Sequence, residues 1–389
     1  MMDGGMDIAF FGPGPLSVCR NGASAYYRGI ICALHERGHS ITFYEPGTTA
    51  GQGHLARNRI GSRSNGQEWA SVLVYPPNEE GARRAIKMAQ EADILIKISC
   101  GGDRPIGPTD SPHMEGMRAP KRLQPLDRLD TWLEEAVLTA RKDGARAVFW
   151  DVDAPATLER LRQNGKDPFM RLVPGYDYIF TYGGGTPVIK GYRELGAKSC
   201  VPIYNALDPL VHYPAPCDKR FHADMSFLGN RIPSREARME EFYLRPARML
   251  KHKSFVLGGT GWEGKAKPPN VRYVGDVRPC DQNAFNCSAK TALDVCWGRA
   301  ALAGCMPSAR IFEAAGAGAC IITDPLDGIE LFFEPGREIL TAKDGEEVAE
   351  ILASLSPDDA REIGQAALSK VLAQHTYAHR AAQFEMVFG

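Results

Sequence analysis

Short apolar runs alternate with longer amphipathic stretches along most of the chain. A short apolar run bounded by turn residues is typical of a strand that is buried on both faces. In the first half such runs lie at residues 7–11, 40–44, 71–75, 93–98, 146–150, 178–182 and 199–204. Stretches with helical periodicity lie between them at residues 23–37, 79–91, 130–142 and 155–163. This alternation predicts an α/β domain whose parallel sheet carries helices on both faces.

The same alternation restarts after a proline-rich segment at residues 213–216. The strands expected in the second half lie at residues 224–228, 253–257, 272–274, 292–295 and 320–322. The helices expected there lie at residues 233–251, 281–288, 307–315, 346–354 and 357–374. We therefore predict two Rossmann-like domains, over residues 1–213 and 214–374. The amphipathic segment at residues 375–389 is expected to return as a helix that packs on the first domain.

Residues 307–324 are expected to form a helix followed by a buried strand, and they carry the main candidate binding residues of the second half. Pro307 suits a first helical position, and Gly316 with Gly318 is expected to end that helix because glycine tolerates a left-handed C-cap. The apolar run that follows ends in Thr-Asp and is expected to be a buried parallel strand. A helix that starts at the edge of a parallel sheet is a favourable place for an anion.

Arg310 and Glu313 are three residues apart in this helix, so both are expected on one face near its start, beside Ser308. An arginine can bind a phosphate bidentately, and a carboxylate can accept hydrogen bonds from both hydroxyls of a ribose. Together these residues predict a pocket for a nucleoside diphosphate. The alternative is a solvated pair between Arg310 and Glu313, which is worth only about 0.2–0.5 kcal/mol.

Two glycine-containing turns of the second half fit the same pocket. The first follows an expected strand and carries Asn230 and Arg231, and the helix after it carries Arg235. The second follows the next strand and carries Gly259 and Trp262. Backbone N–H groups in such turns can cradle a phosphate, and the arginines can neutralise it. We expect Trp262 to flank the nucleobase.

Two carboxylates, Asp151 and Asp153, follow the expected strand at residues 146–150, at the sheet edge where α/β proteins bind ligands. Either one is a candidate base for an attacking hydroxyl. The same spacing holds a divalent cation in some enzymes, although we predict no metal here. The alternative is structural, because Asp153 before Ala-Pro is a good N-cap for the next helix.

The N-terminal strand, glycine turn, helix and strand closed by Glu45 have the outline of a dinucleotide-binding unit. The turn at residues 12–17 reads G-x-G-x-x-S and lacks the third glycine of that motif. We interpret it instead as a wall of a cleft between the two domains. Gly14 and Asn21 in this turn, and Gly184 in a later glycine run, are the candidates for the acceptor side.

The chain has 46 basic and 47 acidic residues, which gives a net charge of −1. A net charge near zero argues against nucleic acid as a partner, but it is compatible with a local basic patch. The ten cysteines occur singly, which favours reduced thiols in a cytoplasmic protein. No apolar run reaches the roughly 18 residues of a membrane span. The polar segments at residues 46–67 and 99–128 are expected to be loops.

Several local motifs resemble the CgeB-like (spore maturation protein) group of nucleotide-sugar glycosyltransferases. Residues 205–208 are similar to the "N-G-V-D" segment that leads into the second domain, and residues 226–231 to the strand and basic turn that contact the donor diphosphate. Residues 311–318 resemble the "F-E-A-x-A-x-G" helix, and residues 333–336 match "F-x-P-G". The resemblance implies a GT-B fold and a glutamate, Glu313, that grips the donor ribose.

One position departs from this resemblance. The wider Glu-x7-Glu pattern of the superfamily would place a first glutamate at Cys305, which cannot accept hydrogen bonds from a sugar as a carboxylate does. The retaining mechanism that goes with that pattern is therefore in doubt. Asp327 and Glu330, in the loop that follows, are the acidic residues available to replace it, and the spacing selects neither.

These observations predict a glycosyltransferase that moves a sugar from a nucleotide-diphosphate donor to an acceptor hydroxyl of unknown identity, without a metal or another cofactor. Arg231, Arg235 and Arg310 would neutralise the leaving diphosphate. The nearest alternative is a nucleotide-sugar epimerase of the same fold. A nicotinamide-dependent oxidoreductase that uses Gly12 and Glu45, or a non-catalytic sugar-nucleotide sensor, are more distant ones.

Overall fold

The computed structural model describes residues 4–12, 22–47, 56–61, 68–99, 124–295 and 306–389. The chain forms two compact units. Residues 1–204 and 381–389 make up the first unit, and residues 205–380 make up the second. The sequence analysis drew the corresponding boundaries at 213/214 and 374/375, so the segment at residues 205–213 lies with the second unit.

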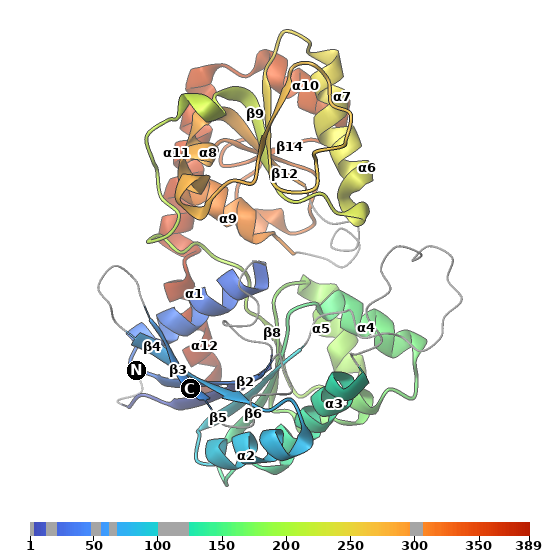
Figure 1. Cartoon of the computed structure of the whole chain (residues 1–389), viewed down its shortest axis with the longest axis vertical. Coiled ribbons are helices and arrows are strands. Elements are labelled where there is room, and N and C mark those ends of the chain that lie inside the picture. Colours follow the sequence, from blue (N-terminus) through green and yellow to red (C-terminus); the bar gives the residue numbers. More distant parts are fainter. Residues whose placement is uncertain (1–3, 13–21, 48–55, 62–67, 100–123, 296–305) are drawn as a thin grey trace. The chain divides into compact units, whose positions relative to one another are not determined.

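The first unit is built on an eight-stranded sheet of order β3-β4-β2-β1-β5-β6-β7-β8 (Figure 1). The strands are β1 (Asp7–Phe11), β2 (Ser40–Pro46), β3 (Ala56–Gly61), β4 (Glu68–Tyr75), β5 (Ile94–Ile98), β6 (Arg146–Asp151), β7 (Tyr178–Thr181) and β8 (Cys200–Pro202). All neighbours pair in parallel except β3, which pairs antiparallel with β4. The prediction that residues 46–67 form only a loop is therefore wrong for β3.

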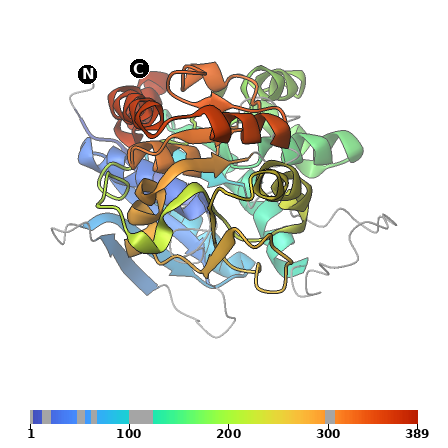
Figure 2. The ribbon, with the colours of Figure 1, turned by 90° about the horizontal axis from the view of Figure 1, so that it is seen from above.

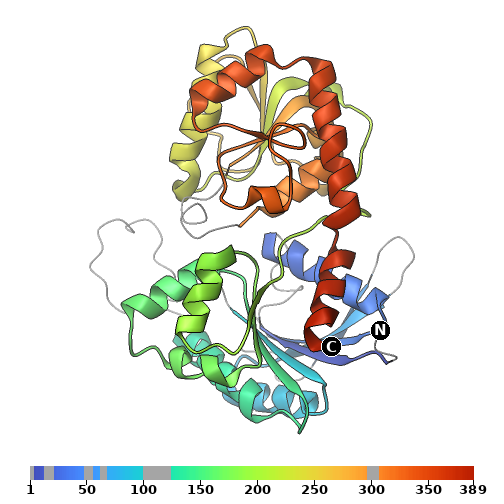
Figure 3. The same ribbon diagram turned by 180° about the vertical axis from the view of Figure 1, so that it is seen from behind.

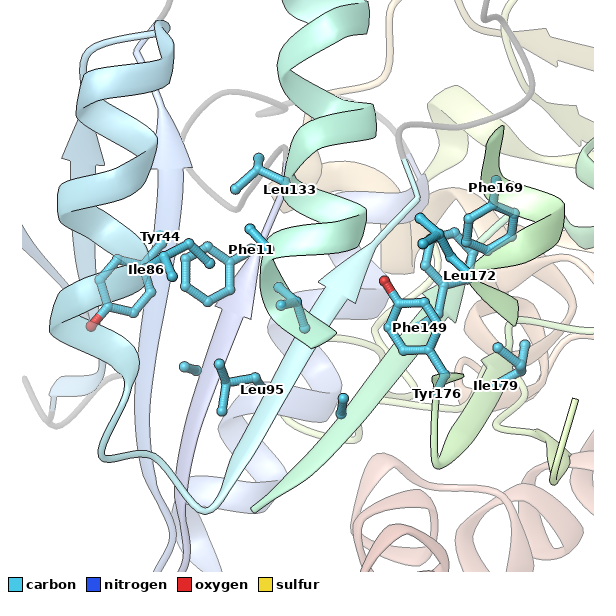
Figure 4. Close-up of a cluster of buried hydrophobic side chains, with 14 of the residues drawn as sticks. Phe11, Tyr44, Ile86, Leu95, Leu133, Phe149, Phe169, Leu172, Tyr176 and Ile179 are labelled. Carbon is cyan, nitrogen blue, oxygen red and sulfur yellow. The ribbon is translucent and has the colours of Figure 1, made fainter. Parts of the chain in front are cut away.

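Helices cover both faces of this sheet, as the alternation predicts. The helices of this unit are α1 (Gly22–Glu36), α2 (Glu79–Ala89), α3 (Gln124–Thr139), α4 (Ala154–Gln163), α5 (Gly185–Glu194) and the last part of α12 (Tyr377–Phe388). Figure 4 shows the core on one face, where Phe11 and Leu95 from the strands meet Ile86 of α2 and Leu133 of α3.

The other face of the same sheet receives the C-terminal helix. Phe10 and Trp150 point to this face, because side chains alternate along a strand. The ring of Phe384 in α12 stacks on Trp150, with their centroids 6.0 Å apart. Phe388, one turn further along α12, lies 6.0 Å from Phe180. The expected return of the C-terminal helix to the first domain is confirmed (Figure 3).

The second unit is built on a six-stranded parallel sheet of order β11-β10-β9-β12-β13-β14. The strands are β9 (Ala223–Leu228), β10 (Phe255–Gly258), β11 (Val271–Gly275), β12 (Ala289–Asp294), β13 (Ile321–Thr323) and β14 (Leu340–Thr341). The chain runs outward from β9 to β11 on one side and from β12 to β14 on the other. The strand order therefore reverses between β9 and β12, which is where sheets of this type bind ligands.

Helices also cover both faces of the second sheet (Figures 1 and 2). They are α6 (Glu236–Met239), α7 (Arg245–Met249), α8 (Gln282–Ser288), α9 (Ala309–Gly316), α10 (Gly345–Ser354) and α11 (Pro357–Gln374). The predicted helix at 233–251 is interrupted by a π-helical turn, Glu240–Leu244, immediately before α7. Pro246 explains the interruption, because it lacks an N–H and its ring crowds the preceding turn.

Within the described part of the chain, no helix combines the length and apolar character that crossing a bilayer requires.

Candidate functional site

A small pocket opens where β9 and β12 lie side by side, at the carboxyl ends of both strands. Its volume is ≈ 20 Å³, which is room for about one water molecule. The polar residues that line it include Gln282 and Asn286 of α8, Asp294 of β12, and Arg310 and Glu313 of α9. The pocket thus coincides with the point where the strand order of the second sheet reverses. Arg310 and Glu313, predicted from their spacing together with the segments before and after them, both line it.

Helix α9 brings those two side chains to the pocket. Ser308 is its N-cap, and its hydroxyl accepts a hydrogen bond from Ile311 N at 3.3 Å and donates one to Asp294 Oδ2 at 2.8 Å. The helix therefore begins after Pro307, which was predicted to be its first residue. Gly318, with φ +77°, takes the left-handed conformation expected after the helix end.

Arg310 is held by fixed acceptors at the ends of the two strands. Its guanidinium donates to Leu228 O at 2.6 Å and lies 3.2 Å from Asp294 Oδ1. The side chain is 23% exposed, so it reaches the surface of the pocket without projecting into solvent. Because its ion-pair partner is Asp294, the alternative of a solvated pair with Glu313 does not describe the structure.

A second arginine lies beside Arg310. The guanidinium carbons of Arg310 and Arg235 lie 5.3 and 6.0 Å from the ring centroid of Phe227, within the range of cation–π attraction. Arg235 is 4% exposed. Both guanidinium groups approach the Cα of Gly229, where a Cβ would lie 3.0 Å from Arg235 and still closer to Arg310. Two of the three arginines predicted to bind the phosphates are therefore brought together.

Glu313 is oriented by two neighbours on other segments. Gln282 Nε2 donates to Glu313 Oε2 at 2.9 Å, and His212 Nε2 lies 3.8 Å from Glu313 Oε1. The side chain of Glu313 is 15% exposed. The carboxylate thus lies at the pocket with one oxygen held by the hydrogen bond from Gln282 and the other facing His212.

The two glycine turns are joined to each other by hydrogen bonds. Asn230 Oδ1 accepts from Thr260 N at 3.0 Å, and Gly229 N donates to Gly258 O at 3.0 Å. Gly259 has φ +114°, and a Cβ there would collide with the backbone of Gly229. Glycine at position 259 is therefore needed for the close approach of the two turns.

Trp262 supports these turns from the inside. Its side chain is 2% exposed in the core of the second unit, and its Nε1 donates to Gly229 O at 2.7 Å. A ring buried in this way does not present a face to a nucleobase, so the role predicted for Trp262 is corrected to a structural one. Arg231 is exposed and pairs with Glu236, apart from the two arginines at Phe227.

The two candidate bases in the first unit differ in their surroundings. Asp151 is fully buried, and it accepts hydrogen bonds from the hydroxyl of Tyr192 and from Asp153 N. Burial and the Asp151 carboxylate raise the pKa of Tyr192 well above its usual value. Asp153 is half-buried and occupies the N-cap of α4, without the side-chain capping bond expected there. Of the two, only Asp153 has solvent-accessible surface.

Of the three candidates for the acceptor side, the structure describes Gly184. Gly184, with φ +107°, precedes α5, and a Cβ there would collide with Val188. Its glycine is thus explained by local packing. Gly14 and Asn21, like Cys305, lie outside the described residues.

Three residues of the site were missed by the sequence analysis: His212, Gln282 and Asp294. The position of Asp294 at the carboxyl end of an expected strand was a signal that could have identified it. Gln282 and His212 carry no such signal, because their contact with Glu313 joins segments separated by dozens of residues.

Residues 235–386 match the family model described as "Glycosyl transferase-like". The matched segment includes both arginines that flank Phe227 and the pocket glutamate. A search of the curated proteins finds no match to the chain.

Solved structures that are similar to the chain include sucrose-phosphate synthase from Thermosynechococcus elongatus, with 12% identity, 98% coverage of each chain and a TM-score of 0.62. Alr3699/HepE of Anabaena, in complex with UDP and glucose, is 11% identical over 98% of this chain and 99% of that chain, with a TM-score of 0.62. T4 phage BGT, in complex with its UDP-glucose substrate, is 13% identical over 98% of this chain and 99% of that chain, with a TM-score of 0.56. The chain therefore has the fold of these proteins, with two Rossmann-like units of the GT-B class.

Proposed function

We propose that this protein is a glycosyltransferase that transfers a sugar from a nucleoside-diphosphate sugar to an acceptor hydroxyl. The observation that carries the proposal is the pocket between β9 and β12, which Arg310 and Glu313 line, with Arg235 next to Arg310 at the ring of Phe227. The family match over residues 235–386 and the sugar nucleotides bound by proteins of the same fold support it. They offer no support for an epimerase or an oxidoreductase.

The two arginines are suited to the leaving diphosphate. When the bond between the sugar and the diphosphate breaks, negative charge builds up on the bridging oxygen and the phosphate oxygens. Arg235 and Arg310 lie side by side around Phe227, so their positive charge is in place before this charge develops. The N-terminus of α9 adds to the positive potential. We therefore propose that the reaction needs no metal ion.

Glu313 is suited to the ribose of the donor. An ionised carboxylate offers about four lone-pair sites, and the bond from Gln282 occupies one of them. The remaining sites can accept hydrogen bonds from the two ribose hydroxyls. We propose this role for Glu313 and assign Asn230 and Gly259 to the backbone turns that approach the phosphates.

The acceptor hydroxyl needs a base if it attacks as an alkoxide-like nucleophile. Asp151 has no exposed surface, so a bound acceptor cannot transfer a proton to it in this conformation. We propose Asp153 for this role, with Asp151 orienting the Asp153 backbone through the 3.1 Å bond to its N–H.

We also propose membership of the CgeB-like group, on the strength of the motifs at residues 226–231, 311–318 and 333–336. A cytoplasmic location is proposed from the cysteines, because all six that the structure describes are free thiols, as expected in a reducing compartment.

The test is isothermal titration of UDP, ADP, GDP and dTDP, and of their glucose conjugates, into the wild type and Glu313→Ala. We expect one of the ribonucleotides to bind most tightly, and we call it the probe nucleotide. Glu313→Ala should weaken its binding by about tenfold or more, which is the loss of one or two hydrogen bonds to a charged group. Failure of the wild type to bind any of these nucleotides refutes the proposal. Donor turnover without an acceptor, giving an epimer, would replace it with the epimerase.

A further inference from the structure

The carboxylate of Glu313 does not stand alone at the pocket. Gln282, the first residue of α8, donates from Nε2 to Glu313 Oε2 at 2.9 Å. Glu313 belongs to α9, so this bond connects two helices on the same face of the second sheet. Both side chains line the pocket, and both are half-buried.

The bond matters because the last torsion of a glutamate is soft. Rotation about the terminal sp³–sp² bond has only broad, two-fold preferences, so a free carboxylate turns readily. Gln282 fixes one oxygen of Glu313, while His212 Nε2 lies 3.8 Å from the other. The carboxylate is then presented to a diol in one orientation, and less rotational freedom is lost when the ligand binds.

A bond that only joined α8 to α9 would not require a glutamine and a glutamate that both line a pocket. The thiol of Cys287 in α8 also donates to Ala317 O, at the C-cap of α9, at 3.1 Å. The bond from Gln282 is thus not the only link between these helices. Its particular effect is on the direction in which the Glu313 oxygens point.

We propose that Gln282 is a positioning residue for donor recognition: it orients the Glu313 carboxylate toward the ribose diol of the nucleotide. The inference rests on the proposed function, because it requires Glu313 to bind that diol. Gln282 acts through Glu313 and contributes to the discrimination between ribose and deoxyribose. Nothing in the sequence pattern around Gln282 indicates this role.

Two substitutions separate the effect of the bond from that of the volume. Gln282→Glu keeps the shape but replaces the donor N–H with an acceptor oxygen, so two carboxylates face each other across 2.9 Å. Like charges at this distance repel, and the Glu313 side chain has to turn away. Gln282→Met keeps most of the volume and removes the hydrogen bond without adding charge.

The matched control is on another helix. Gln163 Nε2 donates to Glu159 Oε1 at 2.6 Å on the exposed surface of α4, so Gln163→Glu makes the same chemical change in a similar pair. The experiment is titration of each variant with the probe nucleotide and with its 2′,3′-dideoxy analogue. Thermal melting of each variant checks that the fold is kept.

We expect Gln282→Glu to weaken binding of the probe nucleotide by about tenfold, and Gln282→Met by roughly threefold, on the scale of one hydrogen bond. Binding of the dideoxy analogue should change less than about twofold in either variant, because the diol is absent. Gln163→Glu should match the wild type with both ligands. Equal losses with both ligands would overturn the inference, because they would show that Gln282 supports the pocket as a whole.

A double-mutant cycle separates this inference from the proposed function. In a Glu313→Ala background, Gln282→Met should cost almost nothing, since its effect is transmitted through the missing carboxylate. If Glu313→Ala weakens binding while both Gln282 variants bind like the wild type, the positioning role fails and the proposed function stands. If the wild type binds no nucleotide, both fail.

Discussion

Adding one methyl group at Gly229 should damage the phosphate site without unfolding the protein. The Cβ of Gly229→Ala would lie 3.0 Å from a guanidinium nitrogen of Arg235 and closer still to one of Arg310. The contact with Arg235 is tight and the contact with Arg310 is too short, so the guanidinium of Arg310 has to move by about 1 Å to reach an ordinary contact distance. Residue 229 is not among the glycines with positive φ, so the backbone itself accepts alanine.

The size of the effect follows from what Arg310 loses. In its present place the guanidinium donates to Leu228 O at 2.6 Å and lies 3.2 Å from Asp294 Oδ1. A hydrogen bond to a charged group is worth about 1.5–3 kcal/mol net. Displacing one such contact from a bound diphosphate should therefore weaken its binding by roughly ten- to a hundredfold. The free energy of unfolding should fall by about 1.5–3 kcal/mol if the bond from the Arg310 guanidinium to Leu228 O is lost.

The assay compares the probe nucleotide with its free nucleoside. Gly229→Ala should lose affinity for the diphosphate and keep its affinity for the nucleoside, because the proposed role of the arginines is to bind the phosphates. Gly264→Ala is the control, since a Cβ at Gly264 meets nothing within 4 Å. The reasoning is refuted if Gly229→Ala binds the diphosphate as tightly as Gly264→Ala does. It is also refuted if the nucleoside and the diphosphate lose affinity equally.

Two further predictions concern residues outside the pocket. Asp151→Ala should lower the free energy of unfolding, measured in urea, by about 1–3 kcal/mol, because the buried hydroxyl of Tyr192 loses this acceptor. The control, Asp153→Ala, should change the free energy of unfolding by less than about 1 kcal/mol. Burial, and then the charge of Arg380, lower the pKa of His375 from 6.5 to about 3. Between pH 6.5 and about 3, His375 is protonated in the unfolded chain but not in the folded chain. The free energy of unfolding that is present above pH 6.5 should therefore decrease as the pH falls toward 3. Between pH 7.5 and 5.0, His375→Gln should lose less stability than the wild type in urea titrations, and an identical loss would contradict the assignment.

The parts of the fold that could be predicted are those that depend on local pattern. A strand buried on both faces needs consecutive apolar residues, and β1, β5 and β6 were found within one residue of their expected bounds. Strand β3 was missed because it lies at the sheet edge with the sequence Ala-Arg-Asn-Arg-Ile-Gly, which has no apolar run. An edge strand is specified mainly by its neighbour, β4, and charged residues are common there.

The candidate site also has residues that local pattern predicts and residues that it does not. Arg310 and Glu313 could be predicted because residues three apart on a helix share a face. The burial of Trp262 could not, because the side of the turn on which its ring lies is decided by tertiary packing, through the core of the second unit and the bond to Gly229 O. The same holds for Asp151, whose position at a strand end is compatible with a catalytic and a structural carboxylate. Its contact with Tyr192 decides for the structural one.

The surroundings of Arg310 also suggest why such a site can release its product. Two guanidinium groups side by side repel each other, and the Asp294 carboxylate next to Arg310 offsets part of that repulsion before any ligand binds. A diphosphate that arrives must share Arg310 with Asp294, so the gain in free energy is smaller than two unpaired arginines would give. The charge that develops on the diphosphate in the transition state shifts this balance toward the ligand, which is the difference that accelerates a reaction. In the proposed reaction, Asp294 would therefore weaken the binding of the ground state and of the product more than it weakens the stabilisation of the transition state.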